Sequence, residues 1–103
     1  MSSGYIDPET LKLIIKKFGS RTGVYGTLIT DKDGLPLQSN LPSQDAEAIA
    51  AQVAALVGKV ERVADEIGRG ELAFITITLT ESEILVAPEA DFTLVVLKKL
   101  DKK

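Results

Sequence analysis

Residues 23–39, GVYGTLITDKDGLPLQS, have the pattern of a β-hairpin. Val24–Thr30 is predicted to form one strand and Leu35–Ser39 a short second strand. Asp31–Gly34 is predicted to form the turn, because glycine tolerates a positive φ and aspartate side chains accept hydrogen bonds from nearby backbone amides. Pro36 has no N–H to donate, which predicts that the second strand lies at a sheet edge. Such a hairpin can begin a sensor domain, a binding module or an enzyme, so the rest of the chain must distinguish among them.

A short helix is predicted before the hairpin. Asp7 is a suitable N-cap, Pro8 fits the first helical position, and Gly19 is a natural C-terminal stop. Apolar residues recur at positions i, i+3, i+4 and i+7: Leu11, Ile14, Ile15 and Phe18. This spacing predicts one apolar stripe along the helix.

A long helix is predicted after the hairpin, with Ser43 as its N-cap, Ile67 near its end and Gly68 stopping it. On a helical wheel, eight apolar residues fall on one broad side, which predicts a core that faces the sheet. These residues are Ile49, Val53, Leu56, Val57, Val60, Val63, Ala64 and Ile67.

Three strands are predicted after the long helix: Glu71–Thr80, Glu83–Ala87 and Asp91–Lys98. The last one is apolar on both faces, which is typical of a central strand covered on both sides. The connections are short enough for antiparallel hairpins. The sequence therefore predicts an α+β fold of the α/β/α sandwich type, in a single domain over residues 1–103. A five-stranded antiparallel sheet would carry the short N-terminal helix on one face and the long central helix on the other.

Composition restricts the classes of function. The chain has 103 residues and a net charge of −3, which is not typical of proteins that bind nucleic acid. It contains no Cys and no His, so the commonest general base and metal ligand are missing. No secretory signal pattern and no apolar run of about 20 residues is present. We therefore expect a cytoplasmic protein without a membrane span.

No pattern of residues predicts catalysis. Four carboxylates flank the later hairpin turns: Glu81, Glu83, Glu89 and Asp91. They are expected to be solvated, although a buried pair would support acid–base chemistry. Asp31 and Asp33 do not begin a calcium loop, because its twelfth position would be Pro42 instead of Glu. An arginine finger toward a nucleotide-hydrolysing partner stays open for three residues, Arg21, Arg62 and Arg69. We predict no catalytic residue, no cofactor and no metal site.

Small residues on the long helix predict contact with a second copy of the chain. Ala51, Ala54, Ala55 and Gly58 follow the i, i+3, i+4, i+7 spacing away from the core side. Glycine inside a helix costs about 1 kcal/mol relative to alanine, and close approach of another backbone would explain it. An antiparallel crossing between Ala54 and Ala55 would bring Glu47 opposite Arg62 of the partner subunit. The alternative is that these alanines simply face water.

The strand predicted at residues 71–80, ELAFITITLT, has neither Pro nor Lys. An open sheet edge of this kind favours aggregation, which pairing with its own copy would prevent. The predicted contacts of this strand are Leu72, Phe74, Thr76 and Thr78. Coverage by a loop or another strand of the same chain remains the alternative.

The hairpin, the Ala-rich helix, the Gly-x-Gly-Glu before a long strand and the closing hairpin together resemble the roadblock family, also called the roadblock-type dynein light chains. The resemblance covers residues 7–98, and longin and profilin domains share related architecture. It implies a non-catalytic dimer, with long helices side by side and a ten-stranded sheet. Members bind Ras-like small GTPases or the dynein motor, and bacterial and archaeal members often pair with a neighbouring GTPase. Known activators rearrange the GTPase instead of donating an arginine.

The sequence departs from many bacterial members after the last strand. Only LKKLDKK follows, which is too short for an independent third helix. We therefore expect a prokaryotic short form without a C-terminal third helix. The expected function is a homodimeric scaffold or regulator of a Ras-like small GTPase, which would bind over the paired long helices. A small-molecule sensor and a purely structural assembly subunit are the alternatives.

Overall fold

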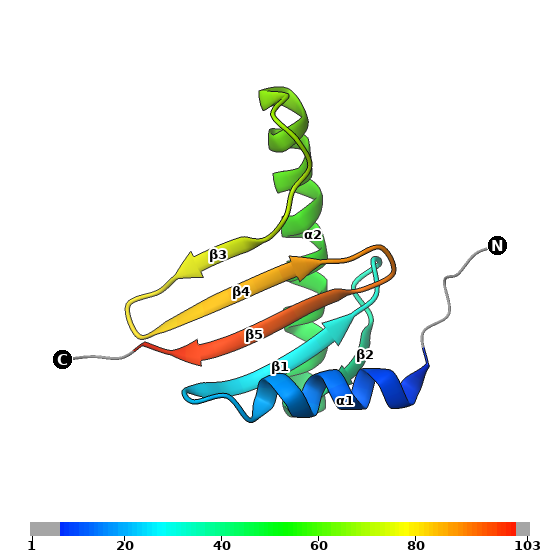
Figure 1. The fold of residues 1–103 in the computed structure, drawn as a ribbon, viewed down its shortest axis with the longest axis vertical. Helices are drawn as coiled ribbons and strands as arrows, with labels where there is room; N and C mark the ends of the chain where they lie inside the picture. Colours follow the sequence, from blue (N-terminus) through cyan, green and yellow to red (C-terminus); the bar gives the residue numbers. More distant parts are fainter. Residues whose placement is uncertain (1–6, 101–103) are drawn as a thin grey trace.

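The structure, a computed structural model, describes residues 7–100 and contains two helices and five strands in that range (Figure 1). The elements follow in the predicted order: α1 (Pro8–Gly19), β1 (Val24–Thr30), β2 (Pro36–Ser39), α2 (Ser43–Ile67), β3 (Ile75–Thr78), β4 (Ser82–Pro88) and β5 (Thr93–Lys99). The helix and strand types expected from the sequence are confirmed. Residues 101–103, part of the segment expected to lack a third helix, lie outside the described range.

The five strands form one antiparallel sheet in the order β2-β1-β5-β4-β3. β5 lies in the centre, as its apolar pattern predicts, and β2 with Pro36 lies at one edge. β3 forms the other edge. The predicted fold class is therefore confirmed.

The helices cover opposite faces of the sheet, so the core has two layers (Figure 1). On the α1 face, the buried residues are Leu11, Ile29, Leu94 and Val96. On the α2 face, they are Leu28, Ala46, Ala50, Val53, Val57, Val86, Val95 and Leu97. Both helices contact β1 and β2, so the β2 half of the sheet is covered from both sides.

The helix ends follow local chemistry, with one correction. The Asp7 carboxylate accepts a hydrogen bond from the Glu9 N–H at 3.4 Å, which confirms this N-cap. Ser43 was predicted to cap α2, but it is the first helical residue and Pro42 occupies the cap position without a side-chain hydrogen bond. Gly68 ends α2 as predicted, because its φ of 72° suits glycine and its N–H donates to the Ala64 carbonyl.

β3 is much shorter than the strand predicted over Glu71–Thr80. The pairing of Ile75 with Val86 would, if continued, bring Ala73 opposite Pro88, which has no N–H to donate. Residues 68–74 instead carry the chain from the end of α2 back to the sheet edge (Figure 1).

The core prediction for α2 was wrong at Val63 and Ile67. Their exposed fractions are 56% and 63%. α2 crosses the strands and continues past β3, so its last turns have no sheet beneath them (Figure 1). The periodicity marks an apolar side of the helix, but the sheet is too narrow to cover all of it.

Candidate interaction surface

The outer edge of β3 is open within the part of the chain that the structure describes. β3 pairs with β4 on one side, and no described strand pairs with its other side. Phe74, just before β3, is 59% exposed, and Thr76 and Thr78 are exposed too. Leu72 is different, because it is partly buried against the core on the α2 face. Three of the four predicted contacts therefore lie at an accessible edge.

The predicted small-residue surface of α2 consists of Ala51, Ala54, Ala55 and Gly58. Part of it faces the β1–β2 turn of the same chain: a Cβ on Gly34 would lie 3.2 Å from Cα of Ala51 and 3.3 Å from Cβ of Ala54. Ala54 therefore has a reason to be small within one chain, whereas the contact at Ala51 involves its backbone. Gly58 has no such reason, since a Cβ there would meet nothing within 4 Å.

The charged residues predicted beside this surface are both exposed. Glu47 lies in the second turn of α2 and Arg62 lies nearer its end. The described residues show one ion pair, and it joins Lys12 to Glu9 instead. The predicted contact of Glu47 with the partner's Arg62 needs a second chain and stays a prediction.

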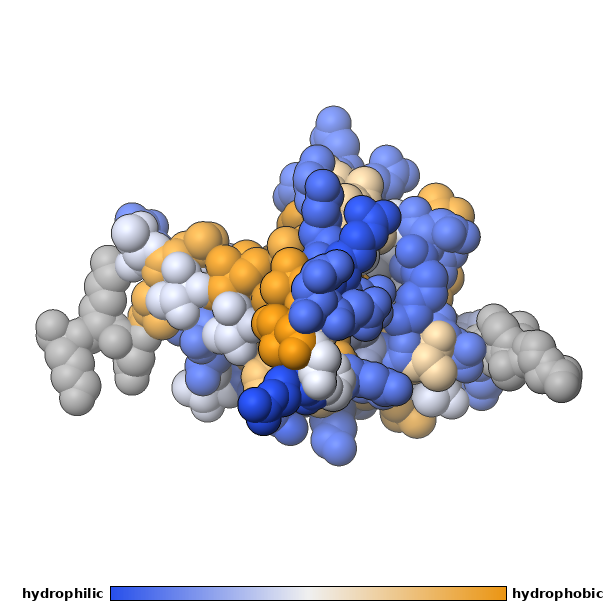
Figure 2. Space-filling view, turned by 90° about the horizontal axis from the view of Figure 1, so that it is seen from above, coloured by the Kyte–Doolittle hydropathy of each residue, from blue (hydrophilic) through white to orange (hydrophobic). Residues whose placement is uncertain are grey.

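A second side of α2, which we call the apolar flank, was missed as a surface because its residues were assigned to the core. It consists of Ile49, Leu56, Val60, Val63 and Ile67, which are half-buried or exposed. Seen from the β3 edge, hydrophobic side chains form a band beside the hydrophilic end of α2 (Figure 2). The clue in the sequence was the width of the apolar side, which exceeds what one sheet face covers.

The apolar flank borders a cavity of about 430 Å³ between α2 and the sheet. Its lining is almost entirely apolar and includes Tyr25, Ile49, Leu56, Ile77 and Ile84. The cavity is open to solvent, and Tyr25 in its lining is 48% exposed. It is a groove that another apolar group would fill.

The apolar flank and the small-residue surface lie on opposite sides of α2. Ile49 and Leu56 share a cavity with Ile77 of β3, whereas Ala54 and Gly58 share one with Asp31 and Thr93. Thr76, in turn, lines a cavity with Phe18 on the α1 face of the sheet. The structure therefore does not bring the predicted helix contacts and the predicted strand contacts together into one continuous surface.

The residues considered for catalysis do not form a site. Glu83 and Asp91 are half-buried, Glu81 and Glu89 are exposed, and no group of three or more potential metal ligands occurs within residues 7–100. The guanidinium of Arg21 lies 4.6 Å from the ring centroid of Phe18, and the other two candidate arginines are exposed. Their arrangement offers no nucleophile, base and orienting group in mutual reach.

Asp31 has a structural role in the turn, as predicted. Its Oδ1 accepts hydrogen bonds from the backbone N–H groups of Asp33 and Leu35, both at 2.9 Å. Gly34 takes a φ of 94°, which permits the tight connection.

Comparison with known proteins identifies the family. A family model described as the Roadblock/LC7 domain matches residues 10–98. The chain belongs to the Roadblock/LC7 domain family. The resemblance inferred from the sequence is thereby confirmed. A protein of Methanocaldococcus jannaschii, MJ0310, is 35% identical over 85 residues, which cover 82% of this chain and 75% of the relative.

Solved structures share the fold. A Roadblock/LC7 domain from Streptomyces avermitilis superposes with a TM-score of 0.79 at 18% identity, covering 84% of this chain and 76% of that one. MglB of Myxococcus xanthus superposes with a TM-score of 0.81 at 15% identity, covering 96% and 77%. At these identities the similarity concerns the fold.

Neither helix of the described residues has the length and apolar character needed to cross a bilayer.

Proposed function

We propose that this Roadblock/LC7 chain is a non-catalytic, single-domain scaffold that forms a homodimer and regulates a Ras-like small GTPase. The observation that carries the dimer is the open β3 edge next to the uncovered apolar flank of α2. Family membership supports the regulatory role, and the GTPase is the partner class that the sequence resemblance implies. A cytoplasmic location is part of the same proposal.

The position of β3 supports the apolar flank as the side of α2 that would meet the partner. β3 extends away from α2 toward the β3–β4 turn (Figure 1). It therefore lies on the side of α2 where Leu56 and Ile77 line the same groove. A two-fold axis at the β3 edge, perpendicular to the sheet, joins two sheets into one. This axis would bring the partner's α2 alongside the apolar flank of the first chain. The protruding end of each α2 would then lie under the sheet of the other chain.

Burial energies favour the same arrangement. Covering a large apolar side chain contributes about 1.5–3 kcal/mol, and Val63 and Ile67 are both more than half exposed. The small-residue crossing at Ala54 and Gly58 offers far less apolar area. The two crossings remain alternative dimers, and Gly58→Leu distinguishes them: the small-residue crossing would be blocked, whereas the apolar-flank dimer would keep its mass in light scattering.

We place the GTPase on the α2 face, over the small-residue surface that the proposed dimer leaves free. Glu47 and Glu61 flank this surface and are exposed, so a basic patch on the GTPase would be attracted. The test uses purified Ras-like GTPases from the same genome, loaded with GDP or with a non-hydrolysable GTP analogue. We expect calorimetric binding that prefers one nucleotide state. Equal or absent binding across all of them would refute the partner.

The groove beside Tyr25 supports a second candidate, a small-molecule sensor. Its apolar lining and volume of about 430 Å³ suit a small hydrophobic ligand. Leu56→Ala distinguishes the two functions because it enlarges the groove. If the protein is a sensor, the variant should change the ligand-induced shift in melting temperature. If it is a GTPase scaffold, the variant should still bind the GTPase. If the second chain of the dimer fills the groove, no space remains for a small-molecule ligand. That result would exclude the sensor function.

A further inference from the structure

Charge is distributed unevenly along the chain. Residues 7–21 and 98–100 contain six basic and two acidic residues, a net charge of +4. Residues 22–97 contain four basic and twelve acidic residues, a net charge of −8. An overall charge of −3 therefore hides a basic segment at each end of the described chain.

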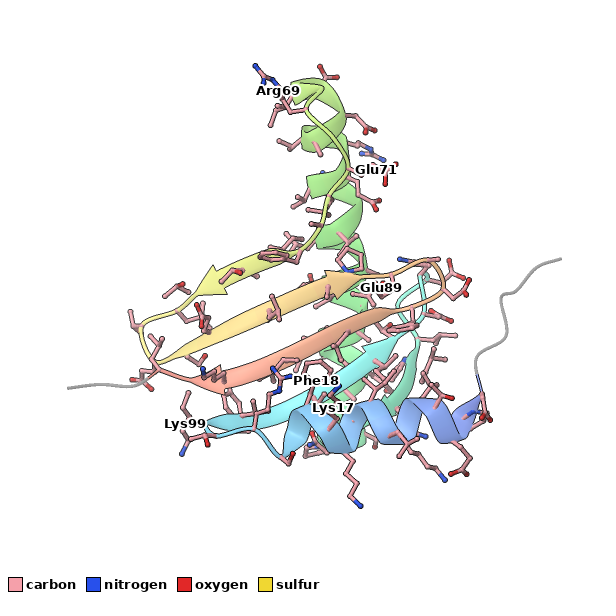
Figure 3. All side chains as sticks on the ribbon, in the orientation of Figure 1. Lys17, Phe18, Arg69, Glu71, Glu89 and Lys99 are labelled. Carbon is pink, nitrogen blue, oxygen red and sulfur yellow. The ribbon has the colours of Figure 1, made fainter. Side chains whose placement is uncertain are left out.

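The fold brings these two segments to one face. Arg21 and Lys98 line the same cavity, which lies beside Phe18 at the end of α1. Lys17 and Phe18 lie at this end of α1, in front of the sheet (Figure 3). We call the resulting surface the basic face: Lys12, Lys16, Lys17, Arg21 and Lys98, all of them exposed.

The acidic residues near this face neutralise only part of it. Glu9 lies 3.8 Å from the Lys12 amine, and Glu83 is the cross-strand neighbour of Lys98. Within residues 7–100, no carboxylate lies within ion-pair distance of Lys16, Lys17 or Arg21. The Arg21 guanidinium is instead held over the Phe18 ring.

An exposed apolar residue lies within the basic face. Leu13 is 67% exposed on the outer side of α1, and Lys16 and Lys17 are its i+3 and i+4 neighbours. A leucine surrounded by lysines is the pattern of a helix that lies at a membrane surface, with long basic side chains reaching the headgroups. The core packing of α1 does not require it, since Leu11 and Phe18 supply the inner side.

We propose that the basic face docks on a membrane surface rich in anionic phospholipid. A flat surface contacts the α1 side alone, whereas a flexible polyanion such as nucleic acid also meets the acidic remainder of the chain. The molecule measures 22 Å along its shortest axis, the axis on which α1 and α2 lie on opposite sides of the sheet. This is more than twice the Debye length of about 8 Å at physiological salt, so the acidic α2 side is screened from the lipid.

The basic face is complete in one chain, so this inference does not rest on the proposed function. If the proposed dimer forms, its axis perpendicular to the sheet would put both basic faces on the same side. The α2 face would then stay free for a protein partner. Basic residues near an anionic surface each strengthen binding about fivefold, so doubling the face would strengthen docking further.

The test is sedimentation of the purified full chain with vesicles of phosphatidylcholine alone or with about one third phosphatidylserine. We expect binding to the anionic vesicles alone, and its loss as salt rises from about 0.05 to 0.5 M. Lys16→Glu with Lys17→Glu should weaken binding at least about thirtyfold. Lys16→Arg with Lys17→Arg should retain it.

The matched control is Lys59→Glu with Arg69→Glu, which changes the net charge equally but away from α1. Both residues are exposed, and Arg69 lies at the protruding end of α2 (Figure 3). This variant should bind like the parent chain. No binding to anionic vesicles, or equal losses in both double variants, would overturn the proposal. Binding to duplex DNA or polyglutamate without vesicle binding would overturn it too.

Discussion

The two edges of the sheet are built differently. The two edge strands are equally short, at four residues each, but β2 begins with Pro36 and both helices pack over its half of the sheet. At the β3 edge the backbone is open, Phe74 is exposed, and the end of α2 has no sheet beneath it. We call these the closed half and the open half: both expose apolar side chains, including Leu35 and Leu37 at the β2 edge, but only in the open half does the end of α2 extend beyond the sheet. Under the proposed dimer, a second copy of the chain completes the open half.

The largest expected effect is in the closed half. Leu28 is fully buried between α2 and the sheet, so Leu28→Ala should lower the free energy of unfolding by about 3 kcal/mol through lost contacts and a cavity. Leu79→Ala makes the same change at a site 48% exposed in the open half, and about 0.5 kcal/mol is expected. Urea unfolding of dilute protein measures both. Equal losses would mean that the two halves do not differ in this way.

A nearly equal effect is expected on association. Val63→Asp with Ile67→Asp removes the most exposed residues of the apolar flank, and should raise the dimer dissociation constant by about a hundredfold or more. Sedimentation velocity over a concentration series measures the constant. Leu13→Asp is the control, because Leu13 is as exposed but lies on α1. A dimer that survives the double substitution would exclude the apolar flank as its interface.

Two glycines permit a smaller and sharper comparison. Gly34→Ala should cost about 2 kcal/mol, because its φ is 94° and the new Cβ would press within 3.2 Å of the Ala51 backbone. Gly68→Ala should cost about 1 kcal/mol, because its φ is 72° but the space around it is open. Thermal and urea unfolding give the difference, which isolates the contact of the hairpin turn with α2. A larger loss of stability at Gly68 than at Gly34 would show that the contact of the turn with α2 is not the dominant cost.

The sequence predicted local structure well where one residue type meets one local requirement. Asp7, Gly68 and the turn at Asp31 are examples, because their hydrogen bonds and φ values involve neighbours in the chain. The edge and centre of the sheet were also predictable, from Pro36 and from the two-sided apolar pattern of β5.

The features that the sequence did not predict, such as the exposure of the α2 end and the length of β3, depend on how far one element extends past another. Helical periodicity shows that Val63 and Ile67 lie on an apolar side, but only the width of the sheet decides whether they are covered. The length of β3 depends on Pro88 across the ladder, which pattern reading along one strand does not reveal. Likewise, the small size of Ala54 is explained by Gly34, which is distant in sequence.

The smallest expected effect tests how the closed edge is held. Asp31→Ala removes the acceptor of two backbone N–H bonds in the turn and should cost about 1 kcal/mol. Asp33→Ala is the control, because its carboxylate accepts no hydrogen bond within residues 7–100, and it should be nearly neutral. Hydrogen exchange at the amides of residues 33 and 35 should accelerate about fivefold in the first variant alone.

The same measurement distinguishes a local turn from a coupled edge. Gly34 connects the Asp31 turn to α2, so loosening the turn should also speed exchange in the nearest turns of the helix, around Ala51 and Ala54. The amides of β3 should be unaffected, because β3 and β2 lie at opposite ends of the strand order. Faster exchange in β3 would show instead that the two halves open as one unit, and the open edge would then be as firmly held as the closed one.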